Sequence, residues 1–338
     1  MGVVGHHGVA HLLHVRARQV IYIFSILMKR FLHKASLYLA ILLAIILPVS
    51  AWLFRQMPGR LMLVSNSVSY NLKADFVRQH REKLSKAGLV VVGSSLSLNN
   101  VSAKMLQDSL GLPTINLSSW ALNIQNFQNS PLWDEKKMFL INIGIADFGD
   151  PPSVEIKDNF SFHTTRAREW LNFLTDIRTF LGMREQTRKI LAIQDNTDYN
   201  SCHFDECGSV LFSVAGFRYD KGQWDADNFD AWGVDSVALT AYVRRLRDIT
   251  VSHHGYSHLV VSFSPLRRKF YNQRRAGLVA YLGQLIRENC PNTTFIDLYD
   301  RNYPDSDYVD HSHFNILGAN RFTGELIDSI RAKGLIGR

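Results

Sequence analysis

The sequence of 338 residues has little cysteine, with three such residues, and it has no internal repeat or low-complexity tract. Three cysteines are too few for a disulfide-dense scaffold, and no group of cysteines and histidines has the spacing of a complete zinc site. No RNA-binding signature is found, so we do not expect nucleic acid as a partner. With 46% hydrophobic and 20% charged residues, the composition is that of a globular protein of one large domain or two small ones.

Two of the cysteines, Cys202 and Cys207, are close enough in the sequence to close a small loop as a disulfide, which an oxidising compartment permits. Together with His203 they could instead begin a zinc site, but the neighbourhood lacks a fourth ligand. We expect the disulfide, and we expect Cys290 to be a buried thiol. The sequence predicts neither a metal nor a cofactor.

A long hydrophobic run stands near the N-terminus, at residues 35–54, and lysine and arginine precede it. About 20 apolar residues suffice to span a bilayer, and flanking cations tend to stay on the cytoplasmic side. We therefore expect residues 1–34 to form a cytoplasmic extension and residues 35–54 to be a transmembrane signal anchor. The small residues around Ala51 leave a cleaved signal peptide open as the alternative.

In both cases the chain from residue 55 onward is expected outside the cytoplasm, in the periplasm or at the cell surface, and secreted if the signal is cleaved near Ala51. The formal net charge of +8 indicates attraction to anionic partners, without choosing among nucleic acid, lipid headgroups and acidic glycans.

Short apolar runs alternate with helical patterns from residue 89 to residue 338, after a polar, helical lead-in at residues 55–88. Such alternation predicts an α/β fold, with a parallel sheet of about five strands and helices on both of its faces. The predicted strands are residues 89–93, 114–117, 137–144, 257–263 and 293–298.

An insertion at about residues 150–234 interrupts this pattern. Its first part, residues 164–194, has apolar residues at helical spacing and is predicted to be one long helical region. Its second part, residues 195–234, is predicted to form loops and a hairpin. Because sugars stack on exposed aromatic rings, this second part could be a substrate wall, and filling a small core is an equal alternative. Its aromatic residues include Phe217, Tyr219, Trp224, Phe229 and Trp232.

The first predicted strand ends in a glycine that is followed by small hydroxyl residues, in the stretch Gly93-Ser94-Ser95-Leu96. A turn between a strand and a helix lies at the carboxyl edge of a parallel sheet, where open α/β folds hold their sites. A serine at this position can be a nucleophile, and it can also cap the helix that follows. Ser95 is the candidate nucleophile.

The loop before the last predicted helix contains Asp310-His311-Ser312-His313. An aspartate three residues before a histidine can hold the imidazole by its Nδ1 proton, which leaves the other nitrogen free to act as a base. This spacing selects His313 as the base and Asp310 as its orienting group. His311 is the rival base, but its spacing to Asp310 is unfavourable.

These two motifs together resemble the SGNH (GDSL-type) hydrolase superfamily, over roughly residues 89–326. Ser95 stands where that family has its nucleophile, and Ser94 stands where the family usually has an aspartate. Asp310 and His313, followed by Asn315, are similar to the family's terminal block. The resemblance implies a three-layer α/β/α sandwich with a flavodoxin-like sheet.

The resemblance also implies an oxyanion hole, a set of N–H donors that stabilises the negative charge of the tetrahedral intermediate. The backbone N–H groups of Ser95 and of the Ser118-Ser119 turn are the expected donors. The family's third block has an asparagine where this chain has Ala146, so Asn123, Asn126 or Asn142 is expected to substitute for it.

The most similar members of the superfamily are membrane-anchored, extracytoplasmic proteins that acylate or deacylate cell-surface polysaccharides. The resemblance therefore implies a serine acyl esterase or O-acyltransferase, acting through an acyl-serine intermediate and typically transferring acetyl groups. Its expected partners are a cell-surface glycan or acylated carbohydrate, a membrane-embedded acyl donor protein, and the membrane through the N-terminal helix. The alternative is a catalytically silent module that binds glycan or a membrane partner during polysaccharide export.

Overall fold

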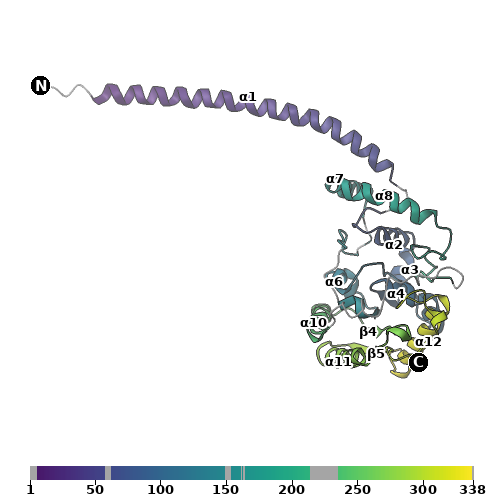
Figure 1. Cartoon of the computed structure of the whole chain (residues 1–338). Coiled ribbons are helices and arrows are strands. Elements are labelled where there is room, and N and C mark those ends of the chain that lie inside the picture. Colours follow the sequence, from purple (N-terminus) through teal and green to yellow (C-terminus); the bar gives the residue numbers. More distant parts are fainter. Residues whose placement is uncertain are drawn as a thin grey trace. The chain divides into compact units, whose positions relative to one another are not determined.

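The computed structural model describes residues 6–57, 62–148, 154–160, 162, 164–213 and 235–336, with only the helical backbone given for residues 6–23. The chain divides into two compact units, Met1–Gln56 and Met57–Arg338. The first unit contains helix α1 (His6–Arg55), drawn in purple in Figure 1. The remaining elements belong to the second unit.

Helix α1 is long and apolar enough to cross a membrane over Phe24–Arg55, by its length and composition. At 1.5 Å per residue these 32 residues extend for about 48 Å, which exceeds the hydrocarbon core of a bilayer. A signal sequence has the same properties, so the choice between an anchor and a signal peptide stays a prediction. The helix is continuous from His6, so it includes residues 6–34 of the predicted extension.

A single five-stranded sheet forms the centre of the second unit, and its strands are all parallel. The strand order is β2-β1-β3-β4-β5. The α/β class and the parallel sheet predicted from the sequence are thus confirmed. The strands are β1 (Leu89–Val92), β2 (Thr114–Asn116), β3 (Met138–Ile143), β4 (His258–Phe263) and β5 (Thr293–Asp297).

Helices cover both faces of the sheet, because alternate residues of the buried strands point to opposite sides. On one face Val90 and Phe139 belong to a core that includes residues of α2, α6, α10 and α11. On the other face Val91 and Leu140 belong to a core with residues of α5 and α12. The bounds of these helices are α2 (Val68–Gln79), α5 (Ala103–Leu110), α6 (Ile124–Phe127), α10 (Ser236–Ser252), α11 (Gln273–Asn289) and α12 (Ile316–Ala332).

The remaining short helices connect these elements. They are α3 (Arg81–Lys86), α4 (Ser95–Asn100) and the 3₁₀ turns η1 (Pro131–Asp134), η2 (Ile145–Phe148), η3 (Arg268–Phe270) and η4 (Asp305–Asp307).

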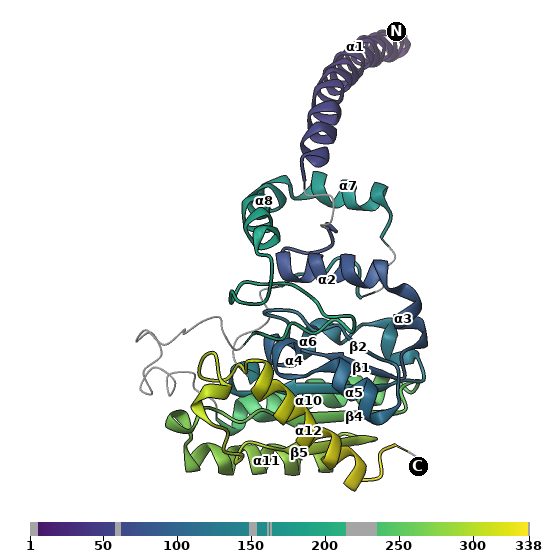
Figure 2. The same ribbon diagram turned by 90° about the vertical axis from the view of Figure 1, so that its right-hand side faces the viewer.

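The helical part of the insertion is two helices, α7 (Arg166–Thr175) and α8 (Ile177–Ala192), and not the single helical region predicted from the sequence. The break falls at Asp176, whose side chain accepts a hydrogen bond from Thr179 N–H and so caps the start of α8. The buried rings of Phe173 and Phe180 stack with their centroids 6.3 Å apart. Helices α7 and α8 lie beyond α2, away from the sheet (Figures 1 and 2).

The expected disulfide between Cys202 and Cys207 is wrong, because both thiols are free. The two side chains have different surroundings. The Cys207 thiol lies 3.1 Å from Lys83 Nζ, whereas the Cys202 thiol is hydrogen bonded to Ser69. Burial raises the pKa of the Cys202 thiol to about 12. Cys290 is a buried thiol, as predicted.

Of residues 195–234, where loops and a hairpin were predicted, the stretch 214–234 lies outside the described residues, together with all five of the named aromatic residues. The part just before it, residues 195–213, is an irregular segment that packs against the sheet's carboxyl edge. Its Phe212 forms an isolated parallel bridge with Asn315, next to the start of α12.

Candidate active site

Two adjacent serines after β1 take different positions, and this separates the two roles that the sequence left open. Ser94 is the N-cap of α4, and its Oγ accepts a hydrogen bond from Leu96 N–H. Ser95 is the first residue of the helix, and its side chain is half-buried and free of the capping bond. The chain reaches this turn through Gly93, whose φ of +138° is a conformation that side-chain-bearing residues rarely adopt.

The structure brings Ser95, His313 and Asp310 into one chain of hydrogen bonds. Ser95 Oγ lies 2.8 Å from His313 Nε2, and His313 Nδ1 lies 2.7 Å from Asp310 Oδ2. His313 and Asp310 are buried. A hydroxyl, an imidazole and a carboxylate in this order are the arrangement that activates a serine for nucleophilic attack.

Asp310 is held in place by its other oxygen as well. Its Oδ1 accepts hydrogen bonds of 2.7 Å from the backbone N–H groups of both Ser312 and His313. Burial alone would raise the pKa of Asp310, but the neighbouring His313 charge and its hydrogen bond outweigh burial and hold that pKa well below its usual range. The carboxyl is therefore ionised at neutral pH and orients the imidazole.

His311, the rival base, lies against Phe270 and Asp310, whereas the ring hydrogen bonded to Ser95 is that of His313. The His311 ring stands edge-on to Phe270, with the centroids 6.1 Å apart, and its Nδ1 is 3.8 Å from Asp310 Oδ1. Burial lowers the pKa of His311 to about 4, so the ring is neutral at physiological pH. The geometry thus selects His313 over His311 as the imidazole in contact with the serine.

Asn100, at the end of α4, fixes the loop that carries the histidine, and sequence reasoning missed it. Its Nδ2 donates to Ser312 O (2.8 Å), and its Oδ1 accepts from Phe314 N–H (2.9 Å). The same short helix therefore begins with Ser95 and ends with Asn100, which is hydrogen bonded to the backbone on both sides of His313. No local sequence pattern marks this role, because its partners lie more than 200 positions away.

Most of the expected oxyanion donors are engaged elsewhere. Ser118 N–H donates to Asn116 Oδ1 (2.9 Å), and Ser119 N–H donates to Gly93 O (3.3 Å). The Asn142 amide is buried and donates to Leu96 O and Ser264 Oγ. These groups consolidate the sheet edge beneath the turn and do not offer their donors to Ser95.

Two expected donors remain. Asn123 is half-buried, and its Oδ1 accepts from Gln125 N–H while its Nδ2 has no partner among the residues that the structure describes. Asn126, the other asparagine considered, donates through its Nδ2 to Val154 O. The backbone N–H of Ser95 likewise has no hydrogen-bond partner within the described part of the chain.

Asp147, after β3, is a second carboxyl close to the triad. It accepts a hydrogen bond from Gly144 N–H at 2.8 Å and a further one from the Ser94 hydroxyl, and it interacts electrostatically with His313. Burial raises its pKa to about 6, and these contacts offset only part of that rise. Ser94 thus links the capped turn after β1 to the turn after β3.

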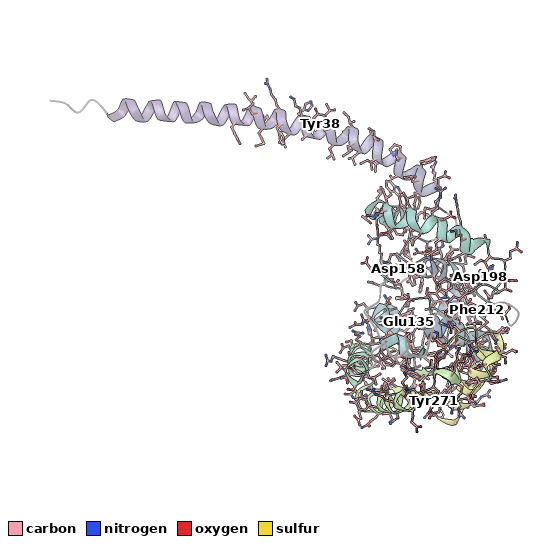
Figure 3. The ribbon with its side chains drawn as sticks, viewed as in Figure 1. Tyr38, Glu135, Asp158, Asp198, Phe212 and Tyr271 are labelled. Carbon is pink, nitrogen blue, oxygen red and sulfur yellow. The ribbon has the colours of Figure 1, made fainter. Side chains whose placement is uncertain are left out.

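A cavity of about 270 Å³ opens beside the serine and is lined by Ser95, Trp120, Tyr199 and Asn200. Trp120 comes from the turn after β2, and the other two residues come from the insertion. Figure 3 labels Asp198, which precedes this pair, and Phe212, which stacks on Tyr199 with the ring centroids 5.5 Å apart. Two aromatic side chains and an amide give the cavity both an apolar wall and a polar one.

Comparison with known proteins does not identify this chain: no family model matches it, and no curated protein matches it significantly. The possibilities for function therefore rest on the residues and their geometry. Among the described residues, no group of three or more histidine, cysteine, aspartate or glutamate side chains is arranged to hold a metal ion.

Proposed function

We propose that this protein is an extracytoplasmic serine acyl esterase or O-acyltransferase of the SGNH type that acts on a cell-envelope polysaccharide. The observation that supports this proposal is the hydrogen-bonded chain from Ser95 Oγ through His313 to Asp310, at distances of 2.8 and 2.7 Å. The strand order 2-1-3-4-5 is also the order of a flavodoxin-like sheet. An apolar N-terminal helix agrees with a membrane-anchored or exported protein.

The reaction begins when Ser95 Oγ attacks the carbonyl carbon of an ester while His313 Nε2 takes the hydroxyl proton. The tetrahedral intermediate collapses, the alcohol leaves with the proton from the imidazolium, and the acyl group stays on Ser95. Water or a sugar hydroxyl then gives its proton to His313 and attacks the acyl-serine. The products are an acid or a new ester, and Ser95 recovers its proton. Asp310 stabilises the imidazolium formed in each half of the reaction.

The cavity beside Ser95 supports a small acyl group attached to a sugar. Its volume of about 270 Å³ is just below the range of about 300–1,000 Å³ that is usual for ligand sites, which favours a small group. Trp120 and Tyr199 provide aromatic surface of the kind on which sugar rings stack, and Asn200 provides polar atoms for their hydroxyl groups. A membrane-embedded partner that supplies the acyl group remains part of this proposal.

A fluorophosphonate probe tests the proposal, because it reacts covalently with an activated serine. We expect the full-length chain in detergent to be labelled at Ser95, as located by peptide mass spectrometry. Ser95→Ala and His313→Ala should lose the label, whereas Ser94→Ala should keep it because Ser94 does not contact His313. Absence of labelling at Ser95 under conditions where the protein is folded would contradict the proposal.

The second candidate is a catalytically silent module that binds glycan or a membrane partner. One specific observation favours it: the N–H groups of Ser118 and Ser119 and the amide of Asn142 already have partners. A missing oxyanion donor costs on the order of 3 kcal/mol of transition-state stabilisation. Glycan binding by a protein that the probe does not label would support this candidate. Release of acetate from an acetylated polysaccharide, lost in Ser95→Ala, would exclude it.

A further inference from the structure

The insertion places a tyrosine hydroxyl against the Asp310–His313 pair. Tyr199 Oη donates to Asp310 Oδ2 at 2.9 Å and lies 3.1 Å from His313 Nδ1. The tyrosine ring stands edge-on to the imidazole, with an interplanar angle of 89°. The hydroxyl therefore contacts both Asp310 Oδ2 and His313 Nδ1, the two atoms that are hydrogen bonded to each other.

The loop that carries Tyr199 is fixed by its own hydrogen bonds. The Asp198 side chain accepts from Asn200 N–H (2.8 Å), and Asp198 O accepts from Ser201 N–H (2.9 Å), which close a turn around the tyrosine. The Tyr199 ring stacks on buried Phe212 with an interplanar angle of 15°. Phe212 O in turn accepts from Ile316 N–H, three residues after the histidine.

The far end of this segment is attached to the turns of the sheet edge. Asn116 N–H donates to Cys207 O (2.7 Å), and Val210 N–H donates to Leu98 O (3.1 Å). The insertion is thus bonded to β2, to α4 and to the start of α12, the elements that surround the site. A side chain on so firmly held a loop keeps its position relative to the triad.

We propose that Tyr199 is a positioning residue for the Asp310–His313 pair, and that its hydroxyl keeps the carboxylate and the imidazole in line with Ser95. The positioning can be tested without any enzymatic activity. Its importance for catalysis rests on the proposed function. The same ring lines the cavity beside Ser95, so a substrate in that cavity contacts the residue that orients the base. The segment 195–213 of the insertion therefore belongs to the active site.

The proposal has a measurable electrostatic consequence. A hydroxyl that donates to the carboxylate weakens its attraction for the imidazolium. The titratable and charged groups facing His313 are Asp310, Tyr199, His311 with its ring centroid 6.5 Å away, and Asp147 through its electrostatic interaction. Removing the hydroxyl alone leaves the other groups unchanged, so any change in the proton affinity of His313 reports the Tyr199 bond.

The experiment is a titration of His313 by NMR in the full-length chain, produced with ¹³C-labelled histidine and kept in detergent micelles. His313→Gln assigns the resonance. We expect Tyr199→Phe, which keeps the stacking on Phe212, to move the titration of His313 toward higher pH. Tyr281→Phe is the matched control, because it removes the same hydroxyl from an exposed tyrosine of α11, and it should leave the titration unchanged. An identical His313 pKa in Tyr199→Phe and wild type would overturn the proposal.

A second substitution should move the His313 titration in the opposite direction. It keeps the shape of the side chain, so the test does not depend on a variant that could misfold. A fluorinated tyrosine at position 199 has nearly the same shape and a more acidic hydroxyl, so it donates more strongly and should lower the pKa of His313. A titration that does not move with the fluorinated residue would equally overturn the proposal. Failure of the proposed function has a different signature: Ser95 would escape the fluorophosphonate probe while the His313 titration still responded to Tyr199.

Discussion

Asn100 is the residue whose loss we expect to damage the site most without removing a reacting group. Asn100→Ala breaks its bonds to Ser312 O and Phe314 N–H and leaves both groups buried without a partner. Unsatisfied buried groups of this kind cost about 2–3 kcal/mol together. We expect that loss in the free energy of unfolding, measured by urea denaturation, and a fall in fluorophosphonate labelling.

The control for this variant is Asn129→Ala. Asn129 is exposed and makes no hydrogen bond to the described residues, so its removal should change the free energy of unfolding by less than about 0.5 kcal/mol. Equal losses in the two variants would show that Asn100 does not hold the histidine loop.

Asp147 predicts a pH dependence of stability that can be measured without an assay of function. Its pKa is about 6 in the folded chain and near 3.8 when unfolded, so the folded state binds more protons between these values. Stability contributed by this group is therefore lost as the pH rises from about 4 through 6. Asp147→Asn removes the ionisation, and its stability relative to wild type should increase over that range.

Urea denaturation at pH 4 and at pH 7 measures the effect. Asp195→Asn is the control, because Asp195 is exposed and its pKa is lowered, chiefly by a hydrogen bond from Thr197. The stability of Asp195→Asn relative to wild type should not increase as the pH rises. If the free energies of unfolding of Asp147→Asn and wild type differ by the same amount at both pH values, the raised pKa of Asp147 is contradicted.

Among the elements, the turn between β1 and α4 places Ser95, and Gly93 is its critical position. A Cβ at Gly93 would collide with Ser97 Oγ, which is held between the backbone N–H and C=O of Asn142 at 2.9 Å each. The positive φ adds strain for any other residue. We expect Gly93→Ala to lower the free energy of unfolding by about 2–3 kcal/mol and to reduce labelling of Ser95.

Gly277→Ala is the matched control for this element. Gly277 lies within helix α11, and an added Cβ would meet nothing within 4 Å. Alanine is the better helix former, so the free energy of unfolding should rise by about 0.5–1 kcal/mol. Two glycines changed in the same way should thus shift thermal denaturation in opposite directions, and shifts of the same sign would contradict the turn argument.

The five strands could be predicted from the sequence because both faces of a parallel sheet are buried, which gives continuous apolar runs such as Leu89–Val92. The sequence pattern predicts a helix over residues 101–110, which corresponds to α5, whereas it does not predict the separate short helix α4. Its first turns are rich in serine and asparagine, which bond to neighbouring strands and loops rather than follow an apolar helical pattern. Tertiary contacts therefore decide this element, and local propensity does not.

At the scale of the whole molecule, the parallel sheet explains why Ser95 and His313 meet although they are 218 positions apart in the sequence. Ser95 follows β1, an inner strand next to the edge strand β2, and His313 follows the opposite edge strand β5 in the loop before α12. The glycine-serine turn after the first strand sufficed to predict Ser95, and the spacing of Asp310 and His313 sufficed to predict the other two members of the triad. The roles of Tyr199 and Asn100 could not be predicted, because their partners are more than 100 positions distant and no short-range spacing records the contact.

Lys73 is a fully buried residue of α2 that connects the insertion to the sheet. Its Nζ donates to Asn116 O at the end of β2 and to Gly208 O in the insertion, and it lies 4.1 Å from the centre of the Phe204 ring. Burial lowers the pKa of Lys73 to about 7, although Asp205 and Cys202 oppose that change. The folded chain thus keeps this amine neutral in a range where the unfolded chain protonates it.

The sign of the resulting pH dependence is opposite to that of Asp147. Between pH 7 and about 10 the unfolded state binds the extra proton, so stability rises with pH in this window. Lys73→Met should lack this increase of stability with pH. The difference in the free energy of unfolding between wild type and Lys73→Met should therefore grow by about 1 kcal/mol per pH unit between pH 7 and pH 9. Lys136→Met changes an exposed lysine and should leave the slope as in wild type. Because the expected change is in the slope, a destabilisation of Lys73→Met that is equal at pH 7 and pH 9 would mean that the variant loses the two hydrogen bonds alone.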